Sequence, residues 1–116
     1  MNDFPQFMKR AANRIATRSQ ATPGVEGYVF HGVDGSQMAY WTCHETATSA
    51  PHVHDFDEYM IVARGCYTLI IDGQRIELHT GAEYVIPRGV VHGGEVVAGT
   101  RTIHMFGGCR AARASG

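Results

Sequence analysis

Short apolar segments separated by turn residues run through the sequence from Val25 onward, and this pattern limits the fold more than any other feature. Turns recur about every 8 to 12 residues, a spacing typical of a β-sandwich or β-barrel. Asp-Gly pairs stand in VDGS (33–36) and in IDGQ (71–74), each between two strand-like segments. Asp-Gly is a strong hairpin signal because a type I′ turn needs positive φ at both central residues. We therefore predict an all-β domain with hairpins at these two places.

The first 18 residues have a different pattern, with apolar side chains on one side of a helical wheel. They recur at helical spacing at Phe4, Phe7, Met8, Ala11, Ala12 and Ile15. We predict one amphipathic helix over residues 1–18 that packs on the barrel or on a dimer partner, and TPG at 22–24 ends it. The barrel is expected over residues 19–109, and the small, polar residues 110–116 are expected to form a flexible tail.

Composition narrows the classes of protein to which the chain can belong. With 116 residues it is long enough for one hydrophobic core. Ten basic and eleven acidic residues, without a basic run, argue against nucleic acid or an anionic membrane surface as partner. No apolar stretch approaches the roughly 18 residues that span a bilayer, and no secretion signal is evident, so we expect a cytoplasmic protein. The three cysteines lack CxxC spacing and are expected to be free thiols.

Four potential metal ligands occur in two segments, HVHDFDE and VVH, as His52, His54, Glu58 and His92. Imidazole and carboxylate bind divalent transition metals, and a set of three histidines and one glutamate leaves coordination positions open. Residues i and i+2 of a strand share one face, so the HxH pair would present both rings together. The alternative is a set of ordinary strand histidines and a solvated glutamate, but the joint pattern favours a metal centre. Iron, manganese, nickel or zinc would each suit it.

The two segments resemble the paired motifs of the cupin family. The first motif, G(x)5HxH(x)3E(x)6G, matches His52, His54, Glu58 and Gly65, with Thr46 at the place of the leading glycine. The second, G(x)5PxG(x)2H(x)3N, matches at Gly81, Pro87, Gly89 and His92, with Val96 at the place of the closing asparagine. The resemblance implies a double-stranded β-helix, a jelly-roll barrel of about eight to eleven strands. It also implies that the four ligands converge in the barrel mouth.

Other residues are weaker candidates for the site. His104 lies on a late strand and could support a ligand or act as a general acid or base, although a structural role is the simpler interpretation. Met60 and Tyr40 are candidates for the pocket wall, within a set of aromatic and apolar residues whose first role is in the core. Asp55 and Asp57 are interpreted as turn residues. A thiol of Cys66 near the cavity is the alternative to a small core residue.

These features predict a metal-dependent enzyme, dioxygenase-like or isomerase-like, that acts on a small organic acid, carbonyl or phenolic compound. The alternative is a non-catalytic barrel that senses or binds a small ligand through its metal, and a third possibility is a purely structural metal. The family resemblance implies the fold and leaves the reaction open. We also expect a homodimer, because two-fold dimers are the commonest soluble assembly and the N-terminal apolar stripe needs a surface to cover.

Overall fold

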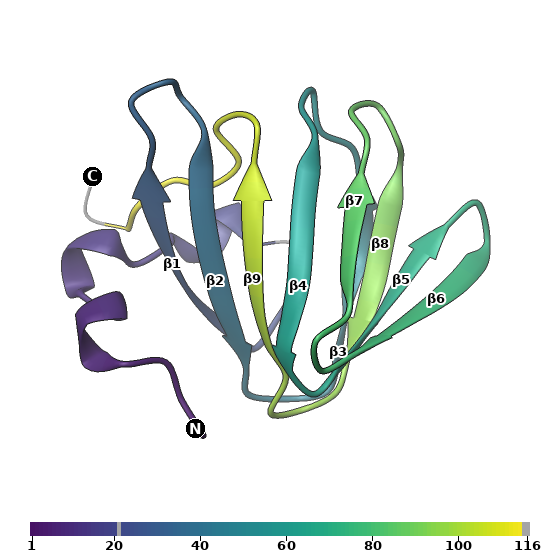
Figure 1. The fold of residues 1–116 in the computed structure, drawn as a ribbon, viewed down its shortest axis with the longest axis horizontal. Helices are drawn as coiled ribbons and strands as arrows, with labels where there is room; N and C mark the ends of the chain where they lie inside the picture. The colour runs from purple at the N-terminus through teal and green to yellow at the C-terminus, as the bar shows by residue number, and fades with distance from the viewer. Residues whose placement is uncertain (21, 115–116) are drawn as a thin grey trace.

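A computed structural model describes residues 1–20 and 22–114 of the chain as two facing antiparallel sheets (Figure 1). The five-stranded sheet has the order β1-β2-β9-β4-β7, and the four-stranded sheet has the order β3-β8-β5-β6. Their bounds are β1 Val25–His31, β2 Gln37–Cys43, β3 Ala47–His52, β4 Glu58–Arg64, β5 Cys66–Ile71, β6 Gln74–His79, β7 Glu83–Ile86, β8 His92–Val96 and β9 Arg101–Phe106. Strands that follow one another in the sequence mostly alternate between the two sheets, as β2, β3, β4 and β5 do, and this is the pattern of a jelly roll. The predicted all-β class is confirmed.

Both Asp-Gly turns join antiparallel neighbours, as predicted. The first connects β1 to β2, with Phe30 opposite Met38, and the second connects β5 to β6, with Ile71 opposite Gln74. In the second turn Asp72 has φ 52° and Gly73 has φ 74°. Positive φ at both positions is the requirement of a type I′ turn, which explains why an Asp-Gly pair stands there.

Alternation along the strands separates an inner face, between the sheets, from an outer face. On β2, Ala39 and Trp41 pack inward with Val29 and Phe106, whereas Tyr40 faces outward with Tyr28 and Phe4. Further along the barrel Met60, Val62 and Leu78 form a second inner cluster. The inner face therefore supplies both the core and the walls of any internal site.

The predicted N-terminal helix is wrong. Residues 1–18 contain only short 3-10 turns, at Gln6–Met8, Ala11–Asn13 and Thr17–Ser19. Arg10 (ψ 137°) and Arg14 (ψ 131°) have extended backbones that interrupt any continuous helix. None of the helical turns in the described part of the chain is long or apolar enough to cross a membrane.

Tertiary contacts explain why the helical pattern does not form a helix. Phe4 is buried on the outer face of the five-stranded sheet, whereas Ile15 is buried in the inner-face cluster with Trp41 and Phe106. The segment must therefore pass around the β1 edge of the sheet, and a straight helix cannot reach both faces. At that edge Ile15 donates its N–H to the Gly27 carbonyl at 2.9 Å, so the segment gains sheet hydrogen bonds in place of helical ones.

The described residues of the C-terminal segment, where we expected a flexible tail from residue 110, contact the barrel and the N-terminal segment. Ala111 is 2% exposed, and the Ala112 carbonyl accepts a hydrogen bond from Ala16 N–H at 2.8 Å. Residues 115 and 116 of the expected tail lie outside the described part of the chain. The N-terminal and C-terminal segments thus pair with each other beside β1.

Candidate metal centre

The ends of three strands bring the predicted ligands together at one end of the barrel. His52 is the last residue of β3, Glu58 is the first of β4 and His92 is the first of β8, while His54 lies in the loop between β3 and β4. His52 is also the direct partner of His92 in the antiparallel pair. Strand register therefore places residues 40 positions apart in the sequence next to each other.

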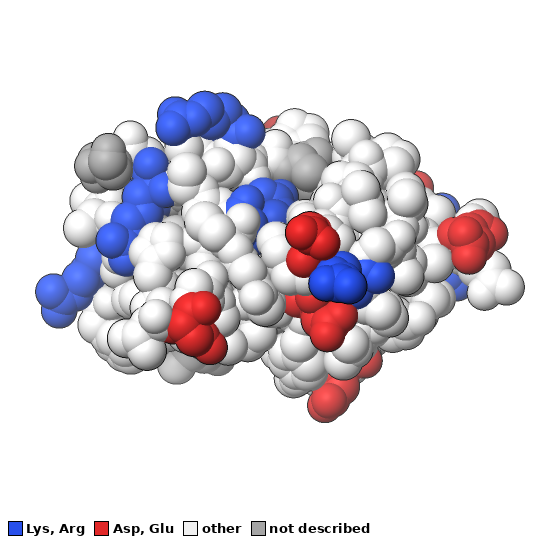
Figure 2. Space-filling view, turned by 90° about the horizontal axis from the view of Figure 1, so that it is seen from above, with Lys and Arg blue, Asp and Glu red and all other residues white. Residues whose placement is uncertain are grey.

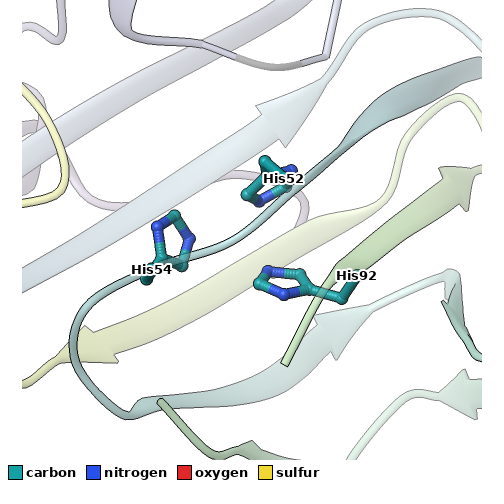
Figure 3. Close-up of side chains that lie close together, drawn as sticks. All are labelled: His52, His54 and His92. Carbon is teal, nitrogen blue, oxygen red and sulfur yellow. The ribbon is translucent and has the colours of Figure 1, made fainter. Parts of the chain in front are cut away.

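The three histidine rings turn toward one space (Figure 3). Each contributes a ring nitrogen, and these atoms all lie within 4.8 Å of one another. Glu58 completes the group: its Oε1 lies 3.3 Å from His54 Nε2 and 3.4 Å from His92 Nε2. The four residues that sequence analysis selected are thus neighbours in the fold.

Backbone carbonyls orient two of the imidazole rings. His52 Nδ1 lies 2.8 Å from the Ala50 carbonyl oxygen, and His92 Nδ1 lies 3.0 Å from the Val90 carbonyl oxygen. A carbonyl only accepts, so each Nδ1 carries the proton and each Nε2 keeps a free lone pair. Burial lowers the pKa of His52, which favours its neutral, ligating form.

Loop contacts bind the two motif segments to each other. Asp57 Oδ1 accepts the Arg88 N–H at 2.8 Å, and Gly89 N–H donates to the His54 carbonyl at 3.0 Å. Gly89 has φ 81°, a conformation that glycine adopts without strain. Asp57 therefore acts as a loop residue, in agreement with the sequence interpretation.

A hydrogen bond from the neighbouring strand β9 orients the buried Glu58 carboxylate. His104 Nδ1 lies 2.8 Å from Glu58 Oε2, and His104 Nε2 lies 2.9 Å from Thr102 Oγ1. Burial by itself would raise the pKa of Glu58, but the adjacent imidazoles of His104, His54 and His92 outweigh it and hold the pKa well below its usual value. The carboxylate is therefore ionised at neutral pH. Its charge in turn raises the pKa of His92 against the lowering effect of burial.

Three buried polar atoms at the centre of this group have no hydrogen-bond partner among the described residues: His54 Nε2, Glu58 Oε1 and His92 Nε2. Buried polar atoms without partners are costly and rare in proteins. Here they are two imidazole nitrogens and one carboxylate oxygen, and the oxygen lies 3.3 Å and 3.4 Å from the two nitrogens. This is the donor set that a divalent transition metal takes, so the residues fit such an ion.

A cavity of about 60 Å³ adjoins the group. It is lined by Gln20, Thr22, Val25, Trp41, Cys43, Ser49, His52, Glu58, Tyr67, His92, Val96, Thr102, His104, Phe106 and Arg110. We call this the inner cavity. A wider hollow of about 530 Å³ opens outside it, and His52, Gln20 and Arg110 border both spaces. Burial raises the pKa of the Cys43 thiol to about 11, so this cysteine is an un-ionised wall residue.

Neither of the two pocket candidates lines the inner cavity. Tyr40 faces outward against Phe4, and its hydroxyl donates to the Met8 carbonyl. Met60 does point inward, but it is fully buried with Val62 and Leu78 below the site. Strand alternation explains Tyr40: its neighbour Trp41 takes the inward position instead.

Several residues of the site carry no signal in the sequence that we could interpret. Arg110 comes from the C-terminal segment that we expected to be flexible, and buried Gln37 hydrogen-bonds to that segment. Tyr67 enters the cavity above Gly94, where a Cβ would lie 2.5 Å from the Tyr67 hydroxyl. The two departures from the family motifs have evident roles: Thr46 Oγ1 accepts the Ala98 N–H at 3.1 Å, and Val96 lines the cavity.

A second group of potential ligands lies away from the inner cavity, at the end of the β5–β6 pair. Cys66 and His79 are direct partners across that pair, and Glu77 lies 3.5 Å from His79. Their ligand atoms also lie within 4.8 Å of one another, but the Glu77 and His79 side chains are more than 60% exposed. Any measurement of metal content must therefore separate this group from the buried one.

Comparisons with known proteins agree with the fold and with the two motifs. The profile of the family described as "Cupin domain" matches residues 39–107. Among solved structures, an RmlC-like cupin from Shewanella frigidimarina superposes with a TM-score of 0.70 at 18% identity, over 90% of this chain and 86% of that one. The polyketide cyclase RemF from Streptomyces resistomycificus gives 0.69 at 19% identity, over 86% and 75% of the two chains.

A third solved structure, KdgF from Halomonas sp., gives a TM-score of 0.66 at 18% identity, over 79% of this chain and 89% of that one. At these identities the likenesses concern the fold. A search of curated proteins finds no match to the sequence.

Proposed function

Because the chain belongs to the cupin domain family, we propose that it is a small metal-dependent enzyme whose ion is held by His52, His54, Glu58 and His92. One observation carries this proposal: His54 Nε2, Glu58 Oε1 and His92 Nε2 are buried, unpartnered and directed at one another. A fold that only needed stability would bury apolar side chains there, since unsatisfied polar atoms lower stability.

The proposed ion is iron, manganese, nickel or zinc, and the reaction is an oxidation by dioxygen or an isomerisation. When bound, such an ion would polarise an oxygen atom of the substrate, and iron or manganese would also support chemistry with dioxygen. The substrate would be a small organic acid, carbonyl or phenolic compound, because the inner cavity holds only about 60 Å³. One structural neighbour bears the name polyketide cyclase, and at 19% identity its likeness extends to the fold alone.

The chain's own residues have three roles in this proposal. Trp41, Tyr67 and Phe106 form an aromatic wall that excludes water from one side of the cavity. Backbone carbonyls orient the imidazoles of His52 and His92, and His104 orients Glu58. His104 is therefore a positioning residue here and a less suitable general acid or base than we expected from sequence, since both of its nitrogens contact protein groups.

The two contacts of His104 favour a second candidate function, a non-catalytic barrel that captures a small ligand through the metal. His104 was the one general acid or base predicted from sequence, and Glu58 and Thr102 engage both of its nitrogens. If no other group transfers protons, binding without turnover is the simpler role. Substrate turnover by the metal-loaded protein separates the two functions.

Metal content, measured by mass spectrometry on untagged protein, tests the proposed centre. We expect close to one transition-metal ion per chain, lost in Glu58→Ala and in His92→Ala. Glu77→Ala and His79→Ala are the matched controls, because they remove the exposed ligand group and leave the buried one. If the purified wild-type protein is folded, as judged by circular dichroism, and contains no transition metal, the proposal of a metal-dependent enzyme is contradicted. Metal lost only in the two controls would assign the ion to the β5–β6 surface.

We also propose a homodimer, through the outer face of the five-stranded sheet. We expected the apolar side chains of the N-terminal segment to cover a partner surface, but Phe4 and Ile15 are already buried against their own chain. This segment therefore gives no argument for a dimer. A row of apolar residues in register does: Met38 is opposite Met105, Met105 is opposite Tyr59, and Tyr59 is opposite Val85. Met105 and Val85 are 43% and 57% exposed. Sedimentation should give a dimer for wild type and a monomer for Met105→Lys, whereas a wild-type monomer would contradict the proposal.

A further inference from the structure

A buried glutamine holds the C-terminal segment in place at the barrel mouth. Gln37, on β2, is 0% exposed, and its Oε1 accepts the Arg110 N–H at 2.6 Å and the Ala111 N–H at 2.9 Å. Its Nε2 donates to the Ala111 carbonyl at 2.9 Å. Three hydrogen bonds from one buried amide to consecutive backbone groups fix the position from which the Arg110 side chain extends. This position is set by the fold, not by the Arg110 side chain itself.

The Arg110 side chain extends to the boundary of the inner cavity and the outer hollow. It borders both spaces, as does His52 of the proposed metal centre. Its Nη1 donates to the Ser19 carbonyl, and no Asp or Glu among the described residues forms an ion pair with it. A guanidinium has five N–H donors, so most of its donors remain available at this boundary. Burial lowers the pKa of Arg110, although the charge of Glu58 opposes this, and an arginine stays protonated in proteins.

The charges around the cavity suit an anion. Among the described residues that line the inner cavity, Glu58 is the one carboxylate and Arg110 the one guanidinium. A divalent ion on the three histidines and Glu58 would leave a net positive centre, and Arg110 adds a second positive charge beside it. Seen from above, Lys and Arg side chains gather over the end of the molecule that carries β1, while Asp and Glu side chains lie mostly over the middle of this face and toward the other end (Figure 2).

We propose that Arg110 binds a carboxylate of the substrate, so that the site takes a small carboxylic acid anion. This inference rests on the proposed metal centre, which would bind the part of the substrate that Arg110 does not contact. A planar guanidinium matches a carboxylate with two parallel N–H···O bonds, and a lysine cannot reproduce that geometry. The small inner cavity leaves room for only a few atoms beyond the carboxylate, and larger substituents would extend into the outer hollow. Gln37 is the positioning residue for this contact.

Binding of carboxylates and of their neutral amides tests the inference. The probes are acetate, pyruvate and benzoate, each paired with its amide, titrated calorimetrically into protein whose metal content is measured on the same sample. We expect at least one carboxylate to bind wild type tenfold or more tightly than its amide. Arg110→Gln should abolish this preference, Arg110→Lys should retain part of it, and none of these changes should alter metal content. Gln37→Ala should weaken the preference while Arg110 is still present.

Arg113→Gln is the matched control, since it removes the same charge three residues further along, away from both spaces, and should leave the preference intact. The inference is wrong if no carboxylate binds better than its amide, or if Arg110→Gln keeps the preference. Thermal melting confirms that the variants fold; Arg110 contacts Gln37 through its backbone, which Arg110→Gln retains. If the carboxylate preference depends on Arg110 but the wild type holds no metal, then the metal-dependent enzyme fails while carboxylate recognition stands.

Discussion

His104 Nδ1 lies 2.8 Å from Glu58 Oε2, and this contact turns the other carboxylate oxygen, Oε1, toward His54 and His92. The two residues are 46 positions apart and come from neighbouring strands, β9 and β4. Trp41 packs edge-on against the His104 ring, with 4.9 Å between ring centroids, and limits its rotation. The orientation of a candidate metal ligand therefore depends on residues that would never touch the ion.

Replacement of His104 by alanine should weaken metal binding by about 10–100-fold, because groups that orient metal ligands have effects of this size. His104→Gln should retain part of the affinity, since an amide can still donate to Glu58. Thr102→Val removes only the contact to His104 Nε2 and should have a smaller effect. Competition with a chelator measures the affinity. If His104→Ala binds metal as tightly as wild type, His104 does not position Glu58.

Ile15→Ala should destabilise the fold by about 2–5 kcal/mol, the range for truncation of a large buried aliphatic residue. Ile15 is 2% exposed and packs with Trp41 and Phe106, whereas Phe7 of the same apolar stripe is 66% exposed. Phe7→Ala should therefore change the free energy of unfolding by about 0.5 kcal/mol or less. Urea denaturation measures both variants. Equal losses would indicate that the stripe packs as one surface, as a helix would.

Gly94→Ala should destabilise the protein by about 1–3 kcal/mol, the usual cost of overpacking. A Cβ at this position would lie 2.5 Å from the Tyr67 hydroxyl and 2.6 Å from its ring, and β8 is held in register with β5 by the sheet. Gly107→Ala is the control, because its Cβ would meet the Asp57 carbonyl at an ordinary 3.5 Å. In a double-mutant cycle measured by thermal unfolding, Tyr67→Ala should reduce the cost of Gly94→Ala. Strictly additive costs would contradict a clash between these two residues.

The protein should lose stability in alkaline solution, partly through Tyr67. Burial raises the pKa of Tyr67 from 10.0 to about 12 in the folded state. Between these values the unfolded chain releases the phenol proton and the folded chain retains it. Stability is thus unaffected by this group below about pH 10 and falls as the pH rises toward about 12.

Tyr67→Phe should reduce the slope of unfolding free energy against pH in that window. Each unit of raised pKa corresponds to about 1.4 kcal/mol. Part of the slope should remain, because burial also raises the pKa of Tyr40 to about 12 and that of Cys43 to about 11. Denaturation at a series of pH values checks this. Superimposable curves for wild type and Tyr67→Phe would indicate that Tyr67 ionises in the folded state as it does in water.

Local chemistry was sufficient to predict much of this molecule. The Asp-Gly pair at 72–73 favours a type I′ turn, and the structure has positive φ at both residues of this hairpin. The spacing of His52, His54, Glu58 and His92 within two motifs indicated that these side chains would meet, and they do. Such features depend on backbone conformation and strand alternation over a few residues, so they can be read from the sequence.

Contacts between distant segments decided the rest. The apolar spacing of residues 4–15 is helical, but Phe4 and Ile15 are buried on opposite faces of the five-stranded sheet, and the sheet edge offers the hydrogen bonds that a helix would have made. Tyr40 and Met60 were candidates for the pocket wall. Strand phase turns Tyr40 outward, and Met60 points inward but is buried in the core away from the cavity. Arg110 borders the cavity from a segment whose backbone is bound by Gln37, 73 residues earlier. The sequence therefore determined the strands, the turns and the candidate metal ligands. The surroundings of those candidates were decided by tertiary packing, which depends on pairs of residues that no local pattern connects.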